Sequence, residues 1–426
     1  MFAGCDHFIY YFMTFENLNI IAPITQALKQ KGYVVPTPIQ EKAIPHLLNG
    51  SDVFGTAQTG TGKTAAFAIP ILQRLYNNGK GHNSGIRALV LAPTRELAIQ
   101  ISESFSDYSK GLKLRHTVIY GGVSQNPQTT ILRKGIDILI ATPGRLLDLM
   151  NQGFVSLNSI EIFILDEADR MLDMGFAPDI KRIIARLPAE RQTGFFTATI
   201  PNEIRALADS LLNKPVKVNV APVSAPAEMV SQSVYYVEKA DKRAMLQQVF
   251  ASEEIETALI FTRTKHGADK VTRELNKLGI SAAAIHGNKS QQARQKALQG
   301  FKNRSVKVLV ATDIASRGID VDKLSHVINF ELPEVPETYV HRIGRTGRAG
   351  EAGTAISFCA SEERGSLKDI NKLLPRSIEV KRMNGFVASV PAAQAGMDVQ
   401  AEAVHHRNRM PRPSGANHRP FQRKRW

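Results

Sequence analysis

The sequence is poor in cysteine and contains no long apolar run. Its two cysteines, Cys5 and Cys359, stand far apart and match neither a metal-ligand spacing nor a disulfide framework. This usage favours the reducing cytoplasm as the compartment. No stretch of about 18 apolar residues is present, so we expect no membrane-spanning helix. The apolar stretch at residues 8–13 lacks a preceding basic segment and is therefore a poor signal peptide.

The charge balance departs from the average in one direction. The 426 residues include 54 Lys or Arg and 39 Asp or Glu, which gives a formal net charge of +15 and a pI near 9.7. This excess favours a polyanionic partner, and RNA, DNA and an anionic membrane surface all fit it. Apolar residues make up 43%, near the globular average, so the chain can bury large cores. At this length we expect two domains.

Short apolar runs recur along the chain, and each precedes a turn and a segment of helical period. Buried strands that alternate with helices are typical of parallel sheets covered on both faces. We therefore predict an α/β fold with two tandem, doubly wound parallel-sheet domains. The runs are residues 88–91, 137–140, 162–165, 258–261 and 306–310.

The alternation of strands and helices is interrupted at places that divide the chain. Residues 221–229 hold two prolines and three alanines and are predicted to be a linker between domains at 13–220 and 230–384. Residues 1–12 are expected to be either a non-native extension, with Met13 as the true start, or a real, short, disordered one that starts at Met1. Residues 385–426 are predicted to be a basic disordered tail, because positions 403–426 hold seven Lys or Arg and no acid.

A glycine-rich loop follows the expected strand at residues 52–55 and opens a helix at Ala65. In such a loop, backbone N–H groups approach phosphate oxygens, a lysine reaches the outer phosphates and a hydroxyl ligates Mg²⁺. Lys63 and Thr64 would take the last two roles. The loop departs from the general pattern at Ala57, which occupies the first glycine position. The predicted phosphate-binding residues are Ala57, Gln58, Thr59, Gly60, Thr61, Gly62, Lys63 and Thr64.

Carboxylates follow the expected buried strand at residues 162–165 directly, in the string Asp166-Glu167-Ala168-Asp169. Ligands bind at the carboxyl edge of open α/β sheets. Asp166 can hold Mg²⁺, partly through water, and Glu167 can orient and deprotonate an attacking water. Alone, an acidic quartet is more often a helix cap or a solvated face. Its position after a strand and downstream of the phosphate loop favours the catalytic interpretation.

These two motifs together resemble those of the DEAD-box ATP-dependent RNA helicases, and the resemblance continues through the other motifs of that family from Phe15 to Ser377. It implies two RecA-like domains, the helicase ATP-binding domain followed by the helicase C-terminal domain, with ATP and Mg²⁺ as cofactors. The tract from Asn329 to Ala355 most resembles the bacterial RhlE-type subgroup.

The resemblance also implies the rest of the ATP site. Residues 37–40 look like the Q motif, in which Gln40 would read the adenine edge while Phe15 stacks on the base and Tyr33 lies beside it. In the second half, Gly318 and Asp320 would join the nucleotide site, with Asp320 at the ribose. By the same resemblance, Arg345 and Arg348 match the arginine fingers of the family. Planar guanidinium groups suit the delocalised negative charge of a phosphoryl-transfer transition state. The implied catalytic residues are Lys63, Asp166, Glu167, Arg345 and Arg348.

Further motifs resemble the segments with which the family grips RNA and couples hydrolysis to unwinding. Each is weak alone, and their order supplies the specificity. Thr197-Ala198-Thr199 departs from the usual Ser-Ala-Thr by one added methyl group. The implied coupling residues are Asp169, Thr197, Thr199 and His341. The implied RNA-binding residues are Pro93, Thr94, Arg95, Gly121, Gly122, Thr142, Pro143, Gly144, Arg145, Arg263, Gln291, Arg294 and Thr312.

The resemblance implies that RNA-induced domain closure drives ATP hydrolysis to ADP and phosphate, with local unwinding of short duplexes or remodelling of RNA–protein complexes. The phosphate loop lies in the first half of the chain and the arginine fingers lie in the second half. The hydrolytic site would therefore be complete only when the two domains close. The expected RNA is single-stranded or a short duplex, read with little sequence specificity. An ATP-gated RNA clamp or assembly factor and a DNA helicase stay open as alternatives, as do ribosomal or RNA-decay assemblies as partners; no membrane partner is expected.

Overall fold

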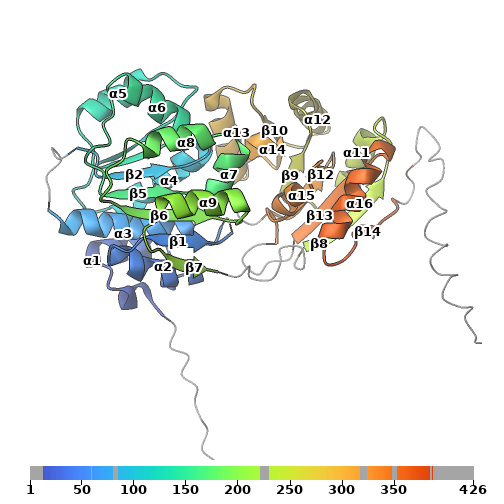
Figure 1. The fold of residues 1–426 in the computed structure, drawn as a ribbon. Coiled ribbons are helices and arrows are strands. Elements are labelled where there is room, and N and C mark those ends of the chain that lie inside the picture. The colour runs from blue at the N-terminus through green and yellow to red at the C-terminus, as the bar shows by residue number, and fades with distance from the viewer. Residues whose placement is uncertain are drawn as a thin grey trace, which may run out of the picture.

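The computed structural model of the chain contains two α/β domains (Figure 1). The predicted extension at 1–12 and linker at 221–229 lie outside the described residues, as does all of the predicted tail at 385–426 except Phe386. Four predicted site residues lie outside them as well, namely Thr59, Gly318, Asp320 and Arg348. The structure describes residues 13–58, 60–79, 85–220, 230–316, 324–347, 353–383 and 386.

The first domain is built on a seven-stranded sheet in which every pairing is parallel. From edge to edge its strands are β3 (His116–Ile119), β4 (Ile138–Ala141), β2 (Ala88–Leu91), β5 (Ile162–Leu165), β6 (Gln192–Thr197), β1 (Val53–Thr56) and β7 (Val216–Asn219). Its helices are η1 (Phe15–Leu18), α1 (Ala22–Gln30), α2 (Pro38–Leu48), α3 (Lys63–Asn77), α4 (Arg95–Tyr108), α5 (Asn126–Arg133), α6 (Pro143–Asn151), α7 (Ala168–Asp173), α8 (Ala177–Ile184) and α9 (Asn202–Leu211).

The second domain repeats this plan with another seven-stranded parallel sheet. From edge to edge its strands are β10 (Ala282–Ile285), β11 (Val308–Ala311), β9 (Ala258–Phe261), β12 (His326–Asn329), β13 (Gly353–Cys359), β8 (Val230–Tyr236) and β14 (Glu379–Val380). Its helices are α11 (Lys242–Ser252), α12 (Lys265–Lys277), α13 (Gln291–Lys302), α14 (Asp313–Ser316), α15 (Pro336–Ile343), η3 (Ser361–Glu363) and α16 (Arg364–Leu373).

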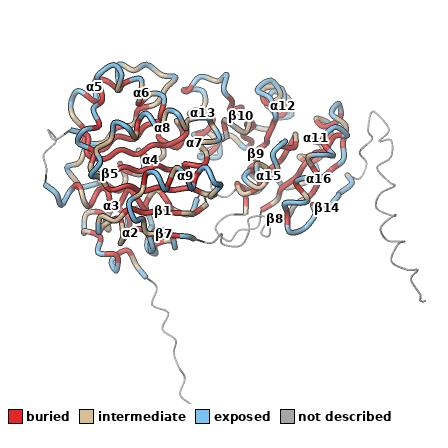
Figure 2. The backbone as a smooth tube through the Cα atoms, in the orientation of Figure 1, coloured by how far each residue is buried: buried red, intermediate tan, exposed pale blue. Residues whose placement is uncertain are grey.

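Each sheet is buried on both faces, as its continuous apolar strands predict. In β5, Ile162 and Ile164 enter the core beneath α1 to α4, whereas Phe163 and Leu165 enter the core beneath α5 to α9. This division follows from the two-residue period of a strand. Figure 2 shows the buried strands at the centre of both domains. The prediction of two doubly wound parallel-sheet domains is confirmed.

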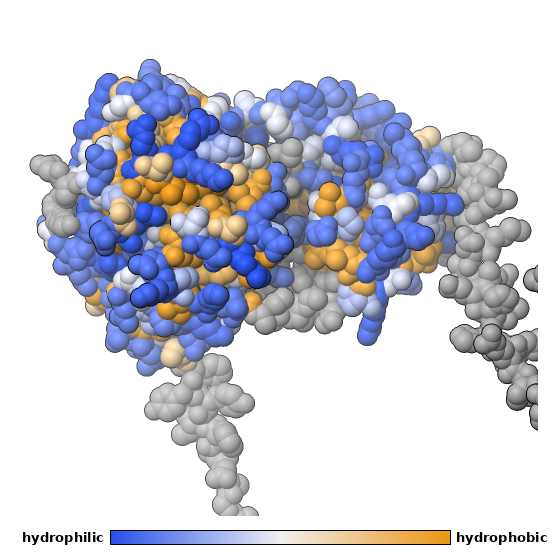
Figure 3. Space-filling model, in the orientation of Figure 1, coloured by the Kyte–Doolittle hydropathy of each residue, from blue (hydrophilic) through white to orange (hydrophobic). Residues whose placement is uncertain are grey.

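Local sequence explains where several helices begin next to the sheet edge. Thr94 accepts a hydrogen bond from the Leu97 N–H (3.2 Å) and caps α4, and Ser290 caps α13 through the Ala293 N–H in the same way. These caps fix helix starts at the carboxyl ends of strands. Hydrophilic residues cover most of the visible face of both domains (Figure 3). Among the described residues, no helix has the length and apolar character needed to cross a membrane.

Candidate functional site

The glycine-rich loop lies between β1 and α3, as expected. Gly60 and Gly62 have φ values of +83° and +89°, which residues with side chains rarely adopt. A Cβ at Gly62 would lie 2.3 Å from Nε2 of Gln40, so the close approach of the Q motif also requires glycine there. The buried Lys63 Nζ donates to the carbonyl of Ala57 (2.8 Å). The lysine side chain therefore spans the loop that is expected to bind the phosphates of the nucleotide.

Ala57, the departure from the general pattern, has a structural explanation. Its side chain is buried in the core beneath α1 to α4. Its N–H donates to the carbonyl of Thr197 at the end of β6 (3.1 Å), and its own carbonyl accepts from Lys63. A methyl group therefore fills core space at this position without occupying the phosphate side of the loop.

A cavity of about 300 Å³ brings the predicted nucleotide residues together. The Q motif contributes Gln40, whose Oε1 accepts from the Thr37 N–H (2.9 Å) and whose Nε2 donates to the Gly62 carbonyl (3.1 Å). Phe15, which is buried, and Tyr33, which is 42% exposed, also line the cavity. The remaining predicted residues that line it are Gly60, Gly62, Lys63, Thr64, Asp166 and Glu167.

Helix α4 supplies cavity residues that the motifs do not indicate. Gln100, Ser104 and Tyr108 line the cavity together with Leu97. Burial raises the pKa of the Tyr108 hydroxyl, and its ring centroid lies 6.3 Å from that of Tyr33. Polar or aromatic residues at positions i, i+4 and i+8 share one helix face, so this spacing was the available signal.

The two carboxylates expected to act on ATP lie at the carboxyl end of β5. The Asp166 N–H donates to the Leu91 carbonyl (3.0 Å), which continues the ladder between β5 and β2. Burial raises the pKa of Asp166 to about 7, against the lowering effect of the nearby Lys63 charge. Glu167 adopts a left-handed conformation with φ of +52°, a strain typical of functional sites. Arg170 Nη1 holds its carboxylate at 2.7 Å.

The last acid of the string links β5 to the segment after β6. The Asp169 Oδ2 accepts three hydrogen bonds, from the N–H of Ala198 (3.1 Å) and from the N–H (2.9 Å) and hydroxyl (3.0 Å) of Thr199. The hydroxyl of Thr197 donates to the Thr199 carbonyl (2.8 Å), and Thr197 is fully buried. The added methyl group of Thr197 is thus accommodated while its hydroxyl keeps a partner.

A smaller cavity of about 50 Å³ lies between the domains. Asp169, Arg170 and Thr199 line it from the first domain, and His341 and Arg345 line it from the second. Burial and the neighbouring Arg170 charge lower the pKa of His341, so its imidazole is neutral near pH 7. Three of the four predicted coupling residues, Asp169, Thr199 and His341, therefore meet one predicted arginine finger at this cavity, and Thr197 does not line it.

Arg342 had no assigned role in the sequence, and its contacts explain how the Arg345 segment is held. It pairs with both carboxylate oxygens of Asp313 (2.6 and 2.8 Å). It also donates to Oδ1 of Asn329 (3.0 Å) and to the carbonyl of Glu331 (2.7 Å). A bidentate pair of this kind, buried on the Arg342 side, fixes orientation, so α15 and the residues just after it present His341 and Arg345 to the first domain from a rigid support.

Arginines predicted to bind RNA gather where α4 meets α13. Arg95 Nη1 donates to Oε1 of Gln291 (3.3 Å). Burial and then the nearby charge of Arg294 lower the pKa of Arg95, and Arg145 adds to this effect. A Cβ at Gly122 would lie 2.3 Å from Arg95, so the paired glycines allow this side chain to pass. Three like charges held together form a surface suited to phosphate groups.

One acid balances this arginine cluster, and the sequence indicated no role for it although it directly follows Arg95. Glu96, only 5% exposed, accepts from Nε2 of Gln291 (3.2 Å) and pairs with Nη2 of Arg294 (3.0 Å). Both partners belong to the other domain. Glu96 is therefore a direct electrostatic link between the two domains.

The other predicted RNA residues have varied surroundings. Pro93, Thr94, Thr142 and Pro143 are buried at or just before the starts of α4 and α6, where they support the neighbouring arginines. Arg145 Nη2 donates to the Val123 carbonyl (3.2 Å), beside the glycine pair Gly121 and Gly122. Those partly or fully exposed include Gly121, Gly122, Gly144, Arg145, Arg263 and Thr312.

Two family descriptions match the chain, DEAD/DEAH box helicase over residues 37–207 and helicase conserved C-terminal domain over residues 241–350. RNA helicase CrhR of Synechocystis is 43% identical over 368 residues, which cover 86% of this chain and 74% of CrhR. DEAD-box ATP-dependent RNA helicase CshA of Streptococcus pneumoniae is 44% identical over 376 residues, 88% of this chain and 70% of CshA. The chain belongs to the DEAD-box RNA helicases.

Solved structures of DEAD-box proteins share the fold. A variant of Dbp5 from S. cerevisiae, solved with RNA and ADP BeF3, is 30% identical with a TM-score of 0.74, covering 87% of this chain and 95% of its own. A DEAD box protein from Methanococcus jannaschii is 38% identical with a TM-score of 0.51, covering 87% and 99%. The tandem RecA-like architecture expected from the resemblance is confirmed. The RhlE-type assignment stays a prediction.

Proposed function

We propose that this chain is an RNA-dependent ATPase and RNA helicase. It hydrolyses ATP to ADP and phosphate when ATP and RNA close its domains, and it unwinds short RNA duplexes locally or remodels RNA–protein complexes. The observation that carries this proposal is the cavity between the domains, where Asp169 and Arg170 face His341 and Arg345. Relatives named as RNA helicases, and Dbp5 solved with RNA and ADP BeF3, support it.

ATP would occupy the cavity formed by the Q motif, the phosphate loop and the carboxylates. Phe15, Gln40 and Lys63 all line this cavity, in which the first two would contact the base and Lys63 the phosphates. The hydrogen bond from Lys63 to the Ala57 carbonyl (2.8 Å) holds the ammonium group inside the loop. When ATP binds, Lys63 would exchange this carbonyl for phosphate oxygens. Gly318 and Asp320 remain proposed nucleotide contacts from the second domain.

Mg²⁺ fits the donors present here. The Asp166 carboxylate and the Thr64 hydroxyl are hard oxygen donors that line the same cavity. Among the residues that the structure describes, no group of three or more His, Cys, Asp or Glu could hold a metal ion by itself. An ion shared between Thr64, Asp166, water and nucleotide phosphates is the usual arrangement for Mg²⁺. When bound, it would neutralise charge on the phosphates.

Glu167 is the proposed base for the attacking water. Its left-handed backbone directs the chain sharply at the end of β5, and its carboxylate is fixed by Arg170 at 2.7 Å. Fixing the base before substrate binds reduces the reorganisation needed during reaction. Arg345, with Arg348 as the second proposed finger, would stabilise negative charge on the transferred phosphoryl group.

RNA would bind across the arginine cluster and favour closure. Arg95 and Arg145 lie in the first domain and Arg294 in the second, so a phosphate backbone that contacts all three ties the domains together. Any ligand that prefers the closed state promotes binding of another that prefers it. ATP and RNA should therefore bind cooperatively, with little dependence on base sequence because phosphates carry none.

The proposed function is tested by two measurements on the purified chain. ATP hydrolysis should rise on adding single-stranded RNA, and a short RNA duplex should be displaced only with ATP. Hydrolysis without displacement would favour the ATP-gated clamp. Equal stimulation by DNA of the same sequence would favour a DNA helicase, and no stimulation by either polymer would refute the proposal. Crosslinking in cells would distinguish ribosomal from RNA-decay substrates.

A further inference from the structure

A larger groove lies along the β10 edge of the second domain's sheet. It has a volume of about 1120 Å³ and shares no lining residue with the nucleotide cavity or the cavity between the domains. Its floor is β10, the edge strand of the sheet. Helix α12 packs on one face of that sheet and α13 on the other, so the two helices flank the strand like walls. We call this feature the β10 groove.

The floor of the β10 groove presents main-chain groups. The Val308 N–H donates to the Ser281 carbonyl (3.0 Å), which sets the alternation of hydrogen bonds between β11 and β10. In a parallel pair, this alternation directs the N–H and C=O of Ala282 and Ala284 to the open edge. The side-chain amide of Asn276 donates to the Ala282 carbonyl (2.9 Å) and accepts from the Ala282 N–H (3.0 Å). Within the described part of the chain, no residue meets the outward groups of Ala284.

The side chains of β10 leave space along this edge. Residues 282–284 are all alanine, so only methyl groups project beside the unpaired main chain. Ala284 is only 9% exposed but lines the groove, and unpaired strand edges are sites where an extended segment can add as a further strand. Most proteins protect the main-chain groups of an edge strand from further pairing. In β10, the Asn276 side chain protects only those of Ala282, the first residue of the strand.

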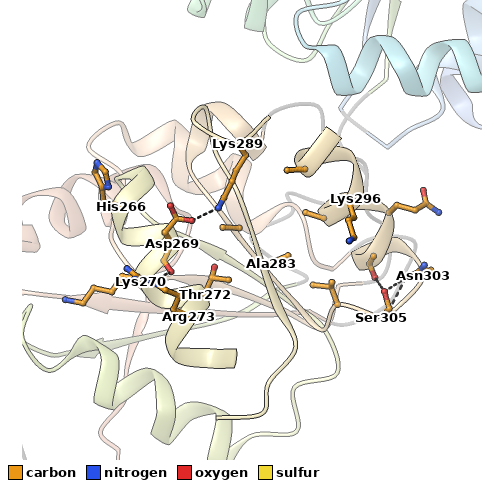
Figure 4. Close-up of a pocket in the computed structure, with 16 residues that line it drawn as sticks. His266, Asp269, Lys270, Thr272, Arg273, Ala283, Lys289, Lys296, Asn303 and Ser305 are labelled. Carbon is orange, nitrogen blue, oxygen red and sulfur yellow. Dashed lines mark hydrogen bonds and ion pairs between the residues drawn. The ribbon is translucent and has the colours of Figure 1, made fainter. Parts of the chain in front are cut away.

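The walls of the β10 groove carry an excess of positive charge. Lys270 and Arg273 project from α12, and Lys296 projects from α13, with Ala283 between them (Figure 4). Lys289 lies at the rim. The acid in the lining, Asp269, is already paired with Lys289 (2.9 Å) and lies 3.1 Å from Nε2 of His286. Lys270, Arg273 and Lys296 are therefore left without an acidic counterpart in the lining.

We propose that the β10 groove binds an extended acidic segment of a partner protein, which adds to β10 as a strand at Ala284 and places carboxylates against Lys270, Arg273 and Lys296. The groove offers a main-chain edge and dispersed lysines, which match a peptide. A strand edge pairs with the main chain of a peptide, and the lining contains no Phe, Tyr or Trp on which unpaired bases could stack. The chain's own segment from 403 to 426 is basic and would be repelled.

The proposal is tested with a fluorescent peptide of repeated Glu-Glu-Val-Val, because neighbouring residues of a strand face opposite sides and the basic residues lie on both walls. The groove variant is Lys270→Glu with Lys296→Glu. The control is Lys277→Glu with Lys302→Glu, which makes the same charge change on exposed positions of the same two helices outside the groove. Anisotropy titrations at physiological salt should show about tenfold weaker peptide binding for the groove variant, because close charge pairs are lost, and little change for the control. Equal affinities of the two variants would overturn the proposal.

Strand addition and the RNA alternative are each tested separately. A peptide N-methylated at alternate residues keeps its charges but cannot pair with a strand edge, so it should bind about tenfold more weakly or worse. Undiminished binding of that peptide would overturn strand addition. RNA-stimulated ATP hydrolysis should need the same RNA concentration in the groove and control variants. A selective rise for the groove variant would assign the groove to RNA and overturn the peptide proposal.

Discussion

Replacing Glu96 by Gln should weaken domain closure without damaging either domain. Glu96 accepts from Gln291 and pairs with Arg294 at 3.0 Å, and both partners come from the second domain. The amide of Gln keeps the shape and can still accept a hydrogen bond from Gln291. It loses the negative charge that offsets three arginines, of which Arg95 already has its pKa lowered by burial and by Arg294.

The size of the effect follows from the contacts. A hydrogen bond to a charged group contributes about 1.5–3 kcal/mol net. Glu96 and Arg294 are both largely buried, with side-chain exposures of 4% and 13%, so screening by solvent is small. A loss of about 2 kcal/mol from the closed state corresponds to roughly a 30-fold change in the closure equilibrium. RNA binding to the first domain in the open state involves no contact with Arg294. The RNA affinity of that state should therefore be unaffected or slightly higher in the variant.

The assay is RNA affinity measured with and without a non-hydrolysable ATP analogue. Wild type should bind RNA more tightly with the analogue, and Glu96→Gln should lose most of that gain, roughly 30-fold at full coupling. Glu103→Gln is the matched control, since Glu103 is exposed on the same helix. If Glu96→Gln keeps the full nucleotide-dependent gain, Glu96 does not link the domains and the reasoning is wrong.

Other single changes should separate binding from turnover. Glu167→Gln should retain ATP and RNA binding but lower ATP hydrolysis by about 10² or more, because the water loses its base; a rate near wild type would exclude that role. Arg345→Ala should lower kcat by about 10³, whereas Arg376→Ala, an exposed arginine of the same domain, should not; equal rates would place the finger elsewhere. Deleting residues 387–426 removes seven basic residues. If about four contact phosphates, the slope of log affinity against log salt should flatten by about 3 while kcat at saturating RNA is constant; an unchanged slope would make the tail a solvated end only.

The sequence alone was sufficient for the fold class and for the local chemistry of the nucleotide site. Continuous apolar runs such as residues 162–165 can be buried only inside a sheet covered on both faces, so they predict parallel strands. Lys63 and Asp166 each follow a strand at its carboxyl end. Parallel strands bring those ends to one edge of the sheet, so the two residues had to be near each other once the sheet formed.

Residue contacts that depend on strand order or on the second domain could be decided only by the tertiary structure. Glu96 and Arg294 are almost 200 positions apart, and nothing local to either indicates the other. The β10 groove exists because β10 lies at the edge in the order β10-β11-β9, whereas the same alanines in a central strand would be covered. Local patterns determine which residues form strands and loops, but which side chains meet depends on packing between distant segments, and that is a property of the whole folded chain.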